Sequence, residues 1–376
     1  MTILAVHPVA QTLDAVSIAG AITFQTAIKR GAGRGAMHAG PAGAGTAAAI
    51  FMGFGANGNV SVLALSDGYA TFHFRADALP ASGDEPIFRF INGAATNKMS
   101  VHLRSDGKLE VYDRTATLVA TGTTVLSAST WYRIAVRGGN GAAAAYEVYI
   151  AADGAAFGAA ELSGTCDQGA TALDRVQLGK SSNKSSQTMS MYFQDLVIDN
   201  AQIWNHYHIG IGLPRANGAN TAWTGDYQDV DEFVCDEATT EITSGTSGHI
   251  ETYLMTSGAD LGIGASDTIN AVSGVNIRVG GASNEALNIT FVSGASTTNT
   301  SNFNCPAAYA IGQFLKLLDP STAAAWTRSG FDAIEVGCKL NSAFAAWVSS
   351  VMAYVMFTPT ASGFIGASNV RYPQVI

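Results

Sequence analysis

The amino-acid sequence predicts an all-β chain of two jelly-roll-like β-sandwich domains in tandem. Three observations predict it. Apolar and polar residues alternate with a period of two over many short segments, helical periodicity is nearly absent, and 41 glycines break the chain into short pieces. Its 376 residues are enough for two domains with separate cores. We therefore expect a first sandwich over 1–203, with an N-terminal arm, a structured linker over 204–225, and a second sandwich over 226–376.

The first domain is expected to contain about a dozen strands between residues 20 and 203. Phe72 and Phe74 should face one side of a strand, with His73 and Arg75 on the other side. The Asp-Gly pair in SDGK predicts a tight turn between strands at 101–103 and 109–111, because glycine readily takes a positive φ. These alternations also predict which residues meet solvent.

The strand expected at 132–137 shows the rule most clearly. Tyr132, Ile134 and Val136 should point inward, which places Arg133 and Arg137 in water.

Strand patterns resume in the second domain, at 275–279 and 287–291 among other places. The segment 307–318 is ambiguous between helix and strand, and 324–332 predicts a helical turn. The apolar run 343–357 is too short for a membrane helix and contains two serines, so we interpret it as a buried strand.

Composition excludes several classes of partner. The formal net charge of −9 and the lack of clustered Lys and Arg argue against nucleic-acid binding. The first residues lack the basic region of a secretory signal, so neither export nor membrane insertion is expected. The glycine-rich segment 31–45 lacks the strand and helix that a dinucleotide-binding loop needs, and we expect it to lead into an early strand.

Cysteine usage gives no sign of a zinc site, because no CxxC pair occurs. Cys338 alternates with apolar residues and is expected to be a small buried hydrophobe. The disulfide state of Cys166, Cys235, Cys305 and Cys338 stays open, and all four thiols should start reduced if assembly is intracellular.

Two places are candidates for metal binding. The acidic run Asp226, Asp229, Asp231 and Glu232, continued by two further acids at 236 and 237, could hold Ca²⁺ through carboxylate oxygens. Its spacing does not match an EF-hand, so a solvated acidic face is the favoured interpretation and no cofactor is expected.

The second candidate is WNHYH. It places His206 and His208 on one face of an extended chain, next to Trp204, but offers no third ligand. Aromatic packing between the two domains is the favoured interpretation there.

No enzyme motif is evident. A retaining glycosidase needs two carboxylates about 5 Å apart, and jelly-roll glucanases place such acids on one strand. The acids on the expected strands are single, as at Glu110, Glu147 and Asp195. There is no GxSxG element, and nothing in the sequence places Ser, His and Asp together as a triad. We therefore expect a protein without catalytic activity.

Four blocks between Ser129 and Trp204 resemble a known fold family. These are STWYRIAVR, YEVYIAADG, VQLGKSS and MYFQDLVIDNAQIW, and together they resemble the laminin-G-like, concanavalin-A-like jelly roll. Such sandwiches bind sugars or hold surfaces together, so the resemblance implies shape more than chemistry.

The second domain resembles a module of tailed-bacteriophage virion proteins. The resemblance rests on GDYQDVDE at 225–232, INAVSGVNIRV at 269–279 and LLDPSTAAAWTRSGFDAIEVGCKL at 317–340. The positions that carry the family pattern in the last segment are Asp319, Pro320, Thr322, Trp326, Thr327, Gly337 and Lys339.

The two resemblances imply a non-enzymatic virion structural protein, assembled in the host cytoplasm. It would be a head decoration or minor capsid protein, or a tail-associated one, and would act through interfaces with major capsid or tail proteins. A homo-oligomer is expected, with a trimer favoured, while position, symmetry and copy number stay open.

The alternative is a lectin-like adhesion or receptor-binding protein that binds a host glycan. Tyr69, Trp131 and Tyr192 are the candidate aromatic residues, of which Trp131 and Tyr192 are expected in or near the core.

Overall fold

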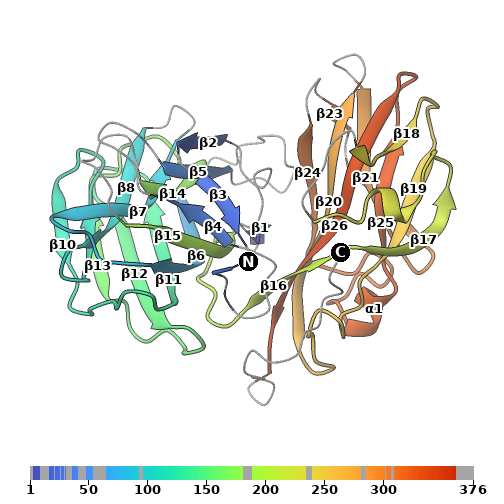
Figure 1. Ribbon diagram of the computed structural model, residues 1–376. Coiled ribbons are helices and arrows are strands. Elements are labelled where there is room, and N and C mark those ends of the chain that lie inside the picture. The colour runs from blue at the N-terminus through green and yellow to red at the C-terminus, as the bar shows by residue number, and fades with distance from the viewer. Residues whose placement is uncertain are drawn as a thin grey trace. The chain divides into compact units, whose positions relative to one another are not determined.

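The computed structural model describes residues 3–8, 17–20, 22–25, 27–28, 30, 36–40, 48–53, 65–92, 96–180, 189–233, 239–280, 285–300, 302–305 and 309–360. The chain divides into two compact units, of which the first ends at His206 and the second begins at Tyr207. Each unit is built from β-strands in two layers (Figure 1). The predicted all-β class and the two sandwiches are confirmed.

Two antiparallel sheets form the first unit within the described residues. The eight-stranded sheet contains, in spatial order, β13 (Leu162–Cys166), β12 (Ala144–Ala152), β11 (Tyr132–Gly139), β6 (Asp67–Ala76), β15 (Met191–Asp199), β4 (Ala36–Ala39) and β3 (Ile22–Gln25), with β1 (Ile3–His7) also paired to β15. The seven-stranded sheet contains β10 (Leu118–Thr121), β9 (Leu109–Tyr112), β8 (Asn97–Arg104), β7 (Asp84–Ile91), β14 (Arg175–Lys180), β5 (Ala48–Gly53) and β2 (Ser17–Gly20).

The core of the first unit lies between these sheets. Phe72 of β6 stacks on Phe88 of β7, with ring centroids 5.4 Å apart, and both rings are fully buried. Every second residue of the neighbouring strands joins them, as the two-residue period requires. Each large side chain buried here stabilises the unit by about 1.5–3 kcal/mol.

The hairpin predicted at SDGK is confirmed. Leu103 of β8 pairs with Leu109 of β9, and Gly107 in the turn has φ +85°. A Cβ at Gly107 would also lie 2.6 Å from the carbonyl oxygen of Leu126, so both conformation and space require glycine. The turn chemistry therefore sets the register of the pair.

Arg133 corrects the expectation that the outward arginines of β11 meet water. Its side chain is fully buried, with its guanidinium over the ring of Phe157 and a hydrogen bond to the carbonyl oxygen of Ala155. The residues that follow β12 cover this part of the sheet, which alternation within one strand cannot reveal. Arg137, four residues later, keeps 26% of its side chain exposed.

The second unit is also a sandwich of two antiparallel sheets within the described residues. One contains β16 (His208–Gly212), β26 (Ala346–Thr358), β20 (Thr268–Gly280) and β24 (Ala310–Lys316), with β18 (Ile242–Ser244) paired to β26. The other contains β17 (Pro214–Thr221), β19 (Ile250–Met255), β25 (Glu335–Leu340), β21 (Glu285–Ser293) and β22 (Ser296–Asn299), with β23 (Phe303–Cys305) paired to β21. The described helical elements of this unit include η2 (Tyr227–Asp229) and α1 (Arg328–Asp332).

The range 204–225, expected as a linker, contains β16 and β17. These strands pair with β26 and β19 and so belong to the two sheets of the second unit. In β16, Ile209 and Ile211 alternate with glycines at 210 and 212 instead of with polar residues. The apolar–polar alternation that usually indicates a strand is therefore hard to recognise in this segment.

Three other expectations for the second unit can be compared directly. The ambiguous segment 307–318 contains strand β24, the helical turn expected at 324–332 is α1, and the apolar run 343–357 overlaps β26. Among the helices of the described residues, none is long and apolar enough to cross a membrane. Of the glycine-rich segment 31–45, only 36–40 are described, and they contain β4.

Candidate functional site

An aromatic and charged surface lies on the outer face of β6, β11 and β12 in the first unit. We call it the Tyr69 platform, and it consists of Asp67, Tyr69, Arg137, Glu147 and Tyr149. Arg137 pairs with Tyr69 on one neighbouring strand and with Glu147 on the other. The core residues of β11 point to the opposite face, so the pleat itself aligns this row outward.

Hydrogen bonds and ion pairs fix the platform. The Arg137 guanidinium lies 5.6 Å from the Tyr69 ring centroid, and its Nε and Nη1 atoms lie 3.3 Å from Asp67 Oδ1 and 3.2 Å from Glu147 Oε1. Tyr149 donates its hydroxyl to Glu147 Oε2 at 2.8 Å. The Tyr69 ring thus lies against the Arg137 guanidinium, and the Tyr149 ring is positioned by its hydrogen bond to Glu147.

The platform is reachable from solvent and carries both donors and acceptors. About a third of the Glu147 side chain and 45% of the Asp67 side chain are exposed, and both tyrosines are half-buried. Burial raises the pKa of Tyr69, and burial together with the bond to Glu147 raises the pKa of Tyr149. Both phenols therefore keep their protons at neutral pH and can donate hydrogen bonds.

A second polar group lies on the outer face of the seven-stranded sheet. We call it the His102 cluster, and it consists of Asp84, Ser100, His102, Glu110 and Tyr112. His102 Nδ1 lies 2.5 Å from Asp84 Oδ1, and His102 Nε2 lies 2.9 Å from Ser100 Oγ. The rings of His102 and Tyr112 stack with centroids 4.3 Å apart.

The His102 cluster corrects the expectation that nothing places Ser, His and Asp together. The Ser-x-His spacing at 100–102 puts two side chains on one face of a strand, and this was the available signal. Asp84 comes from the adjacent strand, at a position that depends on the register across a β-bulge near Pro86.

The single acids expected on the strands also form hydrogen bonds or ion pairs. Glu110 lies 2.8 Å from the Tyr112 hydroxyl, and Glu147 belongs to the Tyr69 platform. Asp195 is buried on a β-bulge, with Oδ2 3.3 Å from Arg30 Nη1. Within the described residues these acids form no pair with each other on one strand.

The acidic candidates for Ca²⁺ take part in local capping. Asp226 accepts a hydrogen bond from the Gln228 amide at 2.8 Å, and Asp229 accepts one from the Asp226 amide at 2.9 Å, which makes a capping box at η2. Glu232 accepts a hydrogen bond from Thr240. Burial and the charges of Asp226 and Asp229 raise the pKa of Asp231.

No group of three or more potential metal ligands is found in the described part of the chain. The acids at 236 and 237 lie outside the described residues. Calcium binding stays an open alternative to the expected solvated acidic face.

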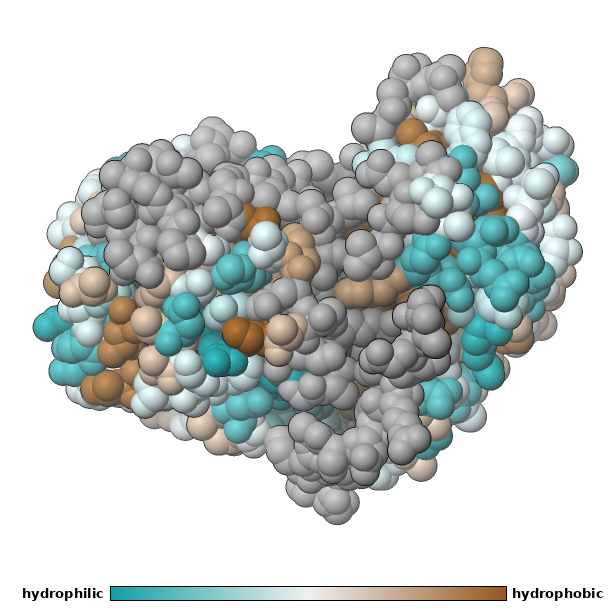
Figure 2. Space-filling model, in the orientation of Figure 1, coloured by the Kyte–Doolittle hydropathy of each residue, from teal (hydrophilic) through white to brown (hydrophobic). Residues whose placement is uncertain are grey.

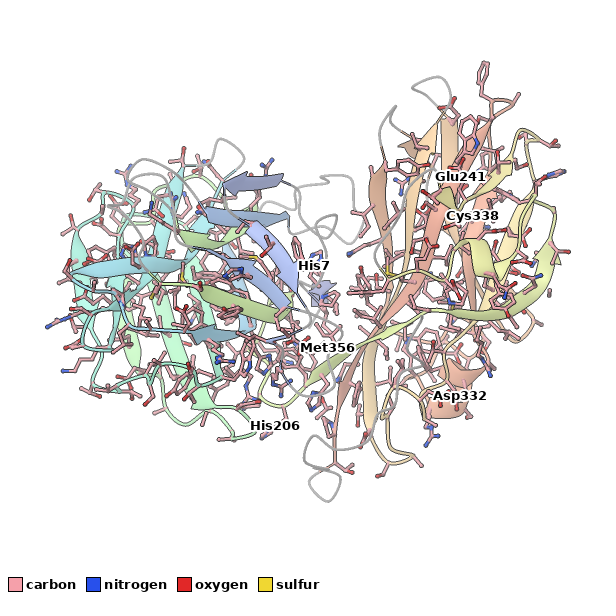
Figure 3. All side chains as sticks on the ribbon, in the orientation of Figure 1. His7, His206, Glu241, Asp332, Cys338 and Met356 are labelled. Carbon is pink, nitrogen blue, oxygen red and sulfur yellow. The ribbon has the colours of Figure 1, made fainter. Side chains whose placement is uncertain are left out.

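WNHYH is divided between the two units. Trp204 is buried in the first unit, where its amide donates to Thr71 Oγ1 at 3.2 Å and its Nε1 donates to Asp199 at 3.0 Å. His206 ends the first unit (Figure 3). His208 begins β16 of the second unit, where its ring lies 5.5 Å from that of Phe357. Hydrogen bonds therefore hold Trp204, whereas the His208 ring lies beside that of Phe357.

The remaining candidates are mostly structural. Tyr192 is buried and stacks on His38 at 5.0 Å, in line with its expected place near the core, and Trp131 is half-buried. Cys166, Cys305 and Cys338 are free and buried, the last on β25 (Figure 3). Cys235 lies outside the described residues.

The segment 317–340 forms a hydrogen-bonded corner. Asp319 Oδ1 accepts from Ser293 Oγ at 2.6 Å and from the Ser321 amide at 2.9 Å. Trp326 Nε1 donates to the Lys316 carbonyl at 3.0 Å, and Thr327 caps α1. These residues shape the fold.

The exposed surface contains few large hydrophobic side chains. Within the described residues they are Leu118, Val125, Leu318 and Phe344. The described atoms on the face shown in Figure 2 accordingly mix hydrophilic and hydrophobic colours. None of these four side chains belongs to the Tyr69 platform, which is defined by its chemistry and geometry.

Comparison of this chain with known proteins found partial likenesses to solved structures. No family model matches it, and neither does any curated protein. Solved structures that resemble it include an endo-β-1,4-glucuronan lyase from the fungus Trichoderma reesei, with 9% identity, a TM-score of 0.39, and coverage of 53% of this chain and 96% of the lyase.

An alginate lyase from Aplysia kurodai has 12% identity and a TM-score of 0.36, with coverage of 48% of this chain and 87% of the lyase. The Ca²⁺- and Man3GlcNAc-bound lumenal domain of VIP36 has 12% identity and a TM-score of 0.31, with coverage of 49% and 84%. Likenesses of this size carry no argument about function.

Proposed function

We propose that this chain is a structural protein of a bacteriophage virion whose first unit binds a glycan at the Tyr69 platform. The observation that carries the glycan-binding part is the geometry of that platform. Two half-buried tyrosine rings and two part-exposed carboxylates surround a guanidinium on three neighbouring strands.

These groups suit a polyhydroxylated ligand. A sugar ring presents an apolar C–H face and a rim of hydroxyls, and tyrosines offer both an aromatic face and a hydroxyl. Glu147 and Asp67 can accept from sugar hydroxyls, while Arg137 donates. Because strand pairing already orders the rings, little side-chain freedom is lost on binding.

The virion part of the proposal is supported by the resemblance of 317–340 to phage virion modules. Its pattern residues Asp319, Trp326 and Thr327 build a corner, which is a structural role. Charged residues make up 13% of the chain, which suits a surface that packs against other proteins. The partners would be major capsid or tail proteins and further copies of this chain, with a trimer as the proposed oligomer.

Glycan binding is tested with the full-length protein on an array of bacterial surface polysaccharides. Tyr69→Ala and Tyr149→Ala should each weaken binding at least tenfold, whereas Phe344→Ala, which removes an exposed aromatic of the second unit, should leave it unchanged. Circular dichroism would verify that the variants fold. Absence of binding by the unaltered protein at high concentration would remove this part of the proposal.

The virion role has a separate test. Mass spectrometry of purified particles from an infected host should detect the intact chain at a fixed copy number that matches the particle symmetry. A free soluble monomer that is absent from particles would contradict this role, whatever the array shows.

A further inference from the structure

The His102 cluster has the connectivity of an activated serine. The His102 imidazole lies between Asp84 Oδ1, at 2.5 Å from Nδ1, and Ser100 Oγ, at 2.9 Å from Nε2. All three side chains project from the outer face of β7 and β8, opposite the core residues Val101 and Leu103. The group therefore faces away from the hydrophobic core.

The chemistry of the partners fixes the neutral tautomer of His102. An ionised carboxylate can only accept hydrogen bonds, so neutral His102 carries its proton on Nδ1 and directs it to Asp84. Nε2 is then left with its lone pair toward Ser100 Oγ. A serine whose hydroxyl donates to such a nitrogen can lose its proton as it attacks an electrophile.

Tyr112 keeps Asp84 and His102 in place. Its hydroxyl oxygen lies 3.0 Å from Asp84 Oδ2 and 2.8 Å from Glu110 Oε2, and its ring stacks on the imidazole. Burial and these two carboxylates raise the pKa of Tyr112, so its proton remains between them at neutral pH. Within the described residues, the Nε2 side of His102 is then directed at the Ser100 hydroxyl.

Arg89 supplies positive charge beside Ser100. It is the cross-strand partner of Ser100 and so faces the same side of the sheet. Its Nε and Nη1 donate to Asn97 Oδ1 at 3.1 Å and to Gln177 Oε1 at 2.9 Å. A guanidinium has five N–H groups, so further donors can meet negative charge that develops on an electrophile at Ser100.

We propose that Ser100 is a nucleophile, with His102 as its base and Asp84 as the residue that orients His102, and that it reacts with small acyl or phosphonyl groups. In the step, Ser100 Oγ forms a bond to the carbonyl carbon or phosphorus and the bond to the leaving group breaks. The serine proton moves to His102 Nε2 and then to the leaving group. Ser100 is 4% exposed, so we expect only small reagents of these two kinds to reach its hydroxyl.

The second unit offers a matched control. Ser244 Oγ lies 3.1 Å from His249 Nδ1, and Ser244 is 8% exposed. Within the described residues no carboxylate is hydrogen-bonded or ion-paired to the His249 ring. Ser244 therefore has a histidine partner but lacks the orienting acid.

The test treats the full-length protein with a short-chain alkyl fluorophosphonate and locates the adduct by peptide mass spectrometry. Phosphonylation releases fluoride as the Ser100 Oγ–P bond forms, so the step needs no other reactant. We expect the adduct on Ser100, none on Ser244, and none at position 100 in Ser100→Ala. His102→Asn and Asp84→Asn should each slow labelling at least tenfold.

The pH dependence separates this role from a purely structural one. Labelling of the unaltered protein should slow in acid, because protonated His102 cannot accept the serine proton, and far-UV circular dichroism would show that the protein stays folded. No adduct on Ser100, or a rate that Asp84→Asn leaves unchanged, would overturn the proposal. The outcome is independent of glycan binding and of the virion role.

Discussion

The guanidinium of Arg133 lies over the ring of Phe157, with its Cζ 4.6 Å from the ring centroid. Arg133 is fully buried on the outer face of β11, and its charge is balanced locally by the aromatic face and by the Ala155 carbonyl oxygen. The burial of Arg133 therefore depends on the residues after β12, which include Ala155 and Phe157.

We expect Phe157→Ala to lower the free energy of unfolding by about 1–2 kcal/mol, because it removes the ring that covers a desolvated cation. Arg133→Met keeps the volume and removes the charge. In a double-mutant cycle measured by urea unfolding, the two changes should couple by about 1 kcal/mol. Additive effects would show that the ring and the guanidinium act independently.

Asp195 should make the stability of the protein depend on pH. Burial raises the pKa of its carboxyl to about 7, even though Arg30 lowers it. A folded-state pKa above the unfolded value of about 3.9 means that the native state holds the proton more tightly. The contribution is therefore complete below about pH 4 and is lost as the pH rises through 7.

Asp195→Asn tests this dependence. Unfolding free energies measured in urea from pH 4 to 7.5 should fall less steeply in the variant than in the unaltered protein, because the amide does not titrate. Equal slopes in the two proteins would count against the raised pKa of Asp195.

Gly337 should tolerate no side chain. It lies in β25, and a Cβ at this position would come within 1.9 Å of the Glu251 carbonyl oxygen on the adjacent strand. We expect Gly337→Ala to destabilise the second unit by about 1–3 kcal/mol. Gly245→Ala is the matched control, since a Cβ added there would meet nothing within 4 Å. Thermal unfolding that shifts equally in both variants would contradict the packing argument.

Three cysteines should be inert in the folded protein. Burial raises the pKa of Cys166 and of Cys305 to about 11 and that of Cys338 well above its usual value. Because the thiolate is the reactive form, we expect a maleimide at pH 7.5 to modify none of them until the chain is unfolded. Rapid labelling of any of the three in the native state, located by peptide mapping, would be inconsistent with their burial.

Local patterns were sufficient for much of the fold. The pair Leu103 and Leu109 could be placed because a two-residue period and an Asp-Gly turn both act over a few neighbouring residues. The position of Arg133 could not be predicted, because its cover comes from Phe157, more than twenty residues later. Burial of an outward residue is decided by tertiary structure, which the period of one strand does not contain.

For the candidate surfaces, too, single residues could be identified in the sequence, but their association could not. Tyr69 and Glu147 were each identifiable in the sequence, one as a candidate aromatic and the other as an isolated acid. Their association through Arg137 depends on the register of three strands. The neighbourhood of Asp84 and His102 depends on register in the same way, so a search for contiguous motifs could not find it.

The place of β26 in its sheet has a consequence for protein synthesis. This strand is the last of the described strands, yet it lies between β16 and β20 in the middle of the five-stranded sheet. On the ribosome, a nascent chain that has not yet released residue 358 would leave β16 and β20 with open edges, which are prone to wrong pairing. The described strands of the first unit are complete by Asp199, so this unit can close while the second is still being translated.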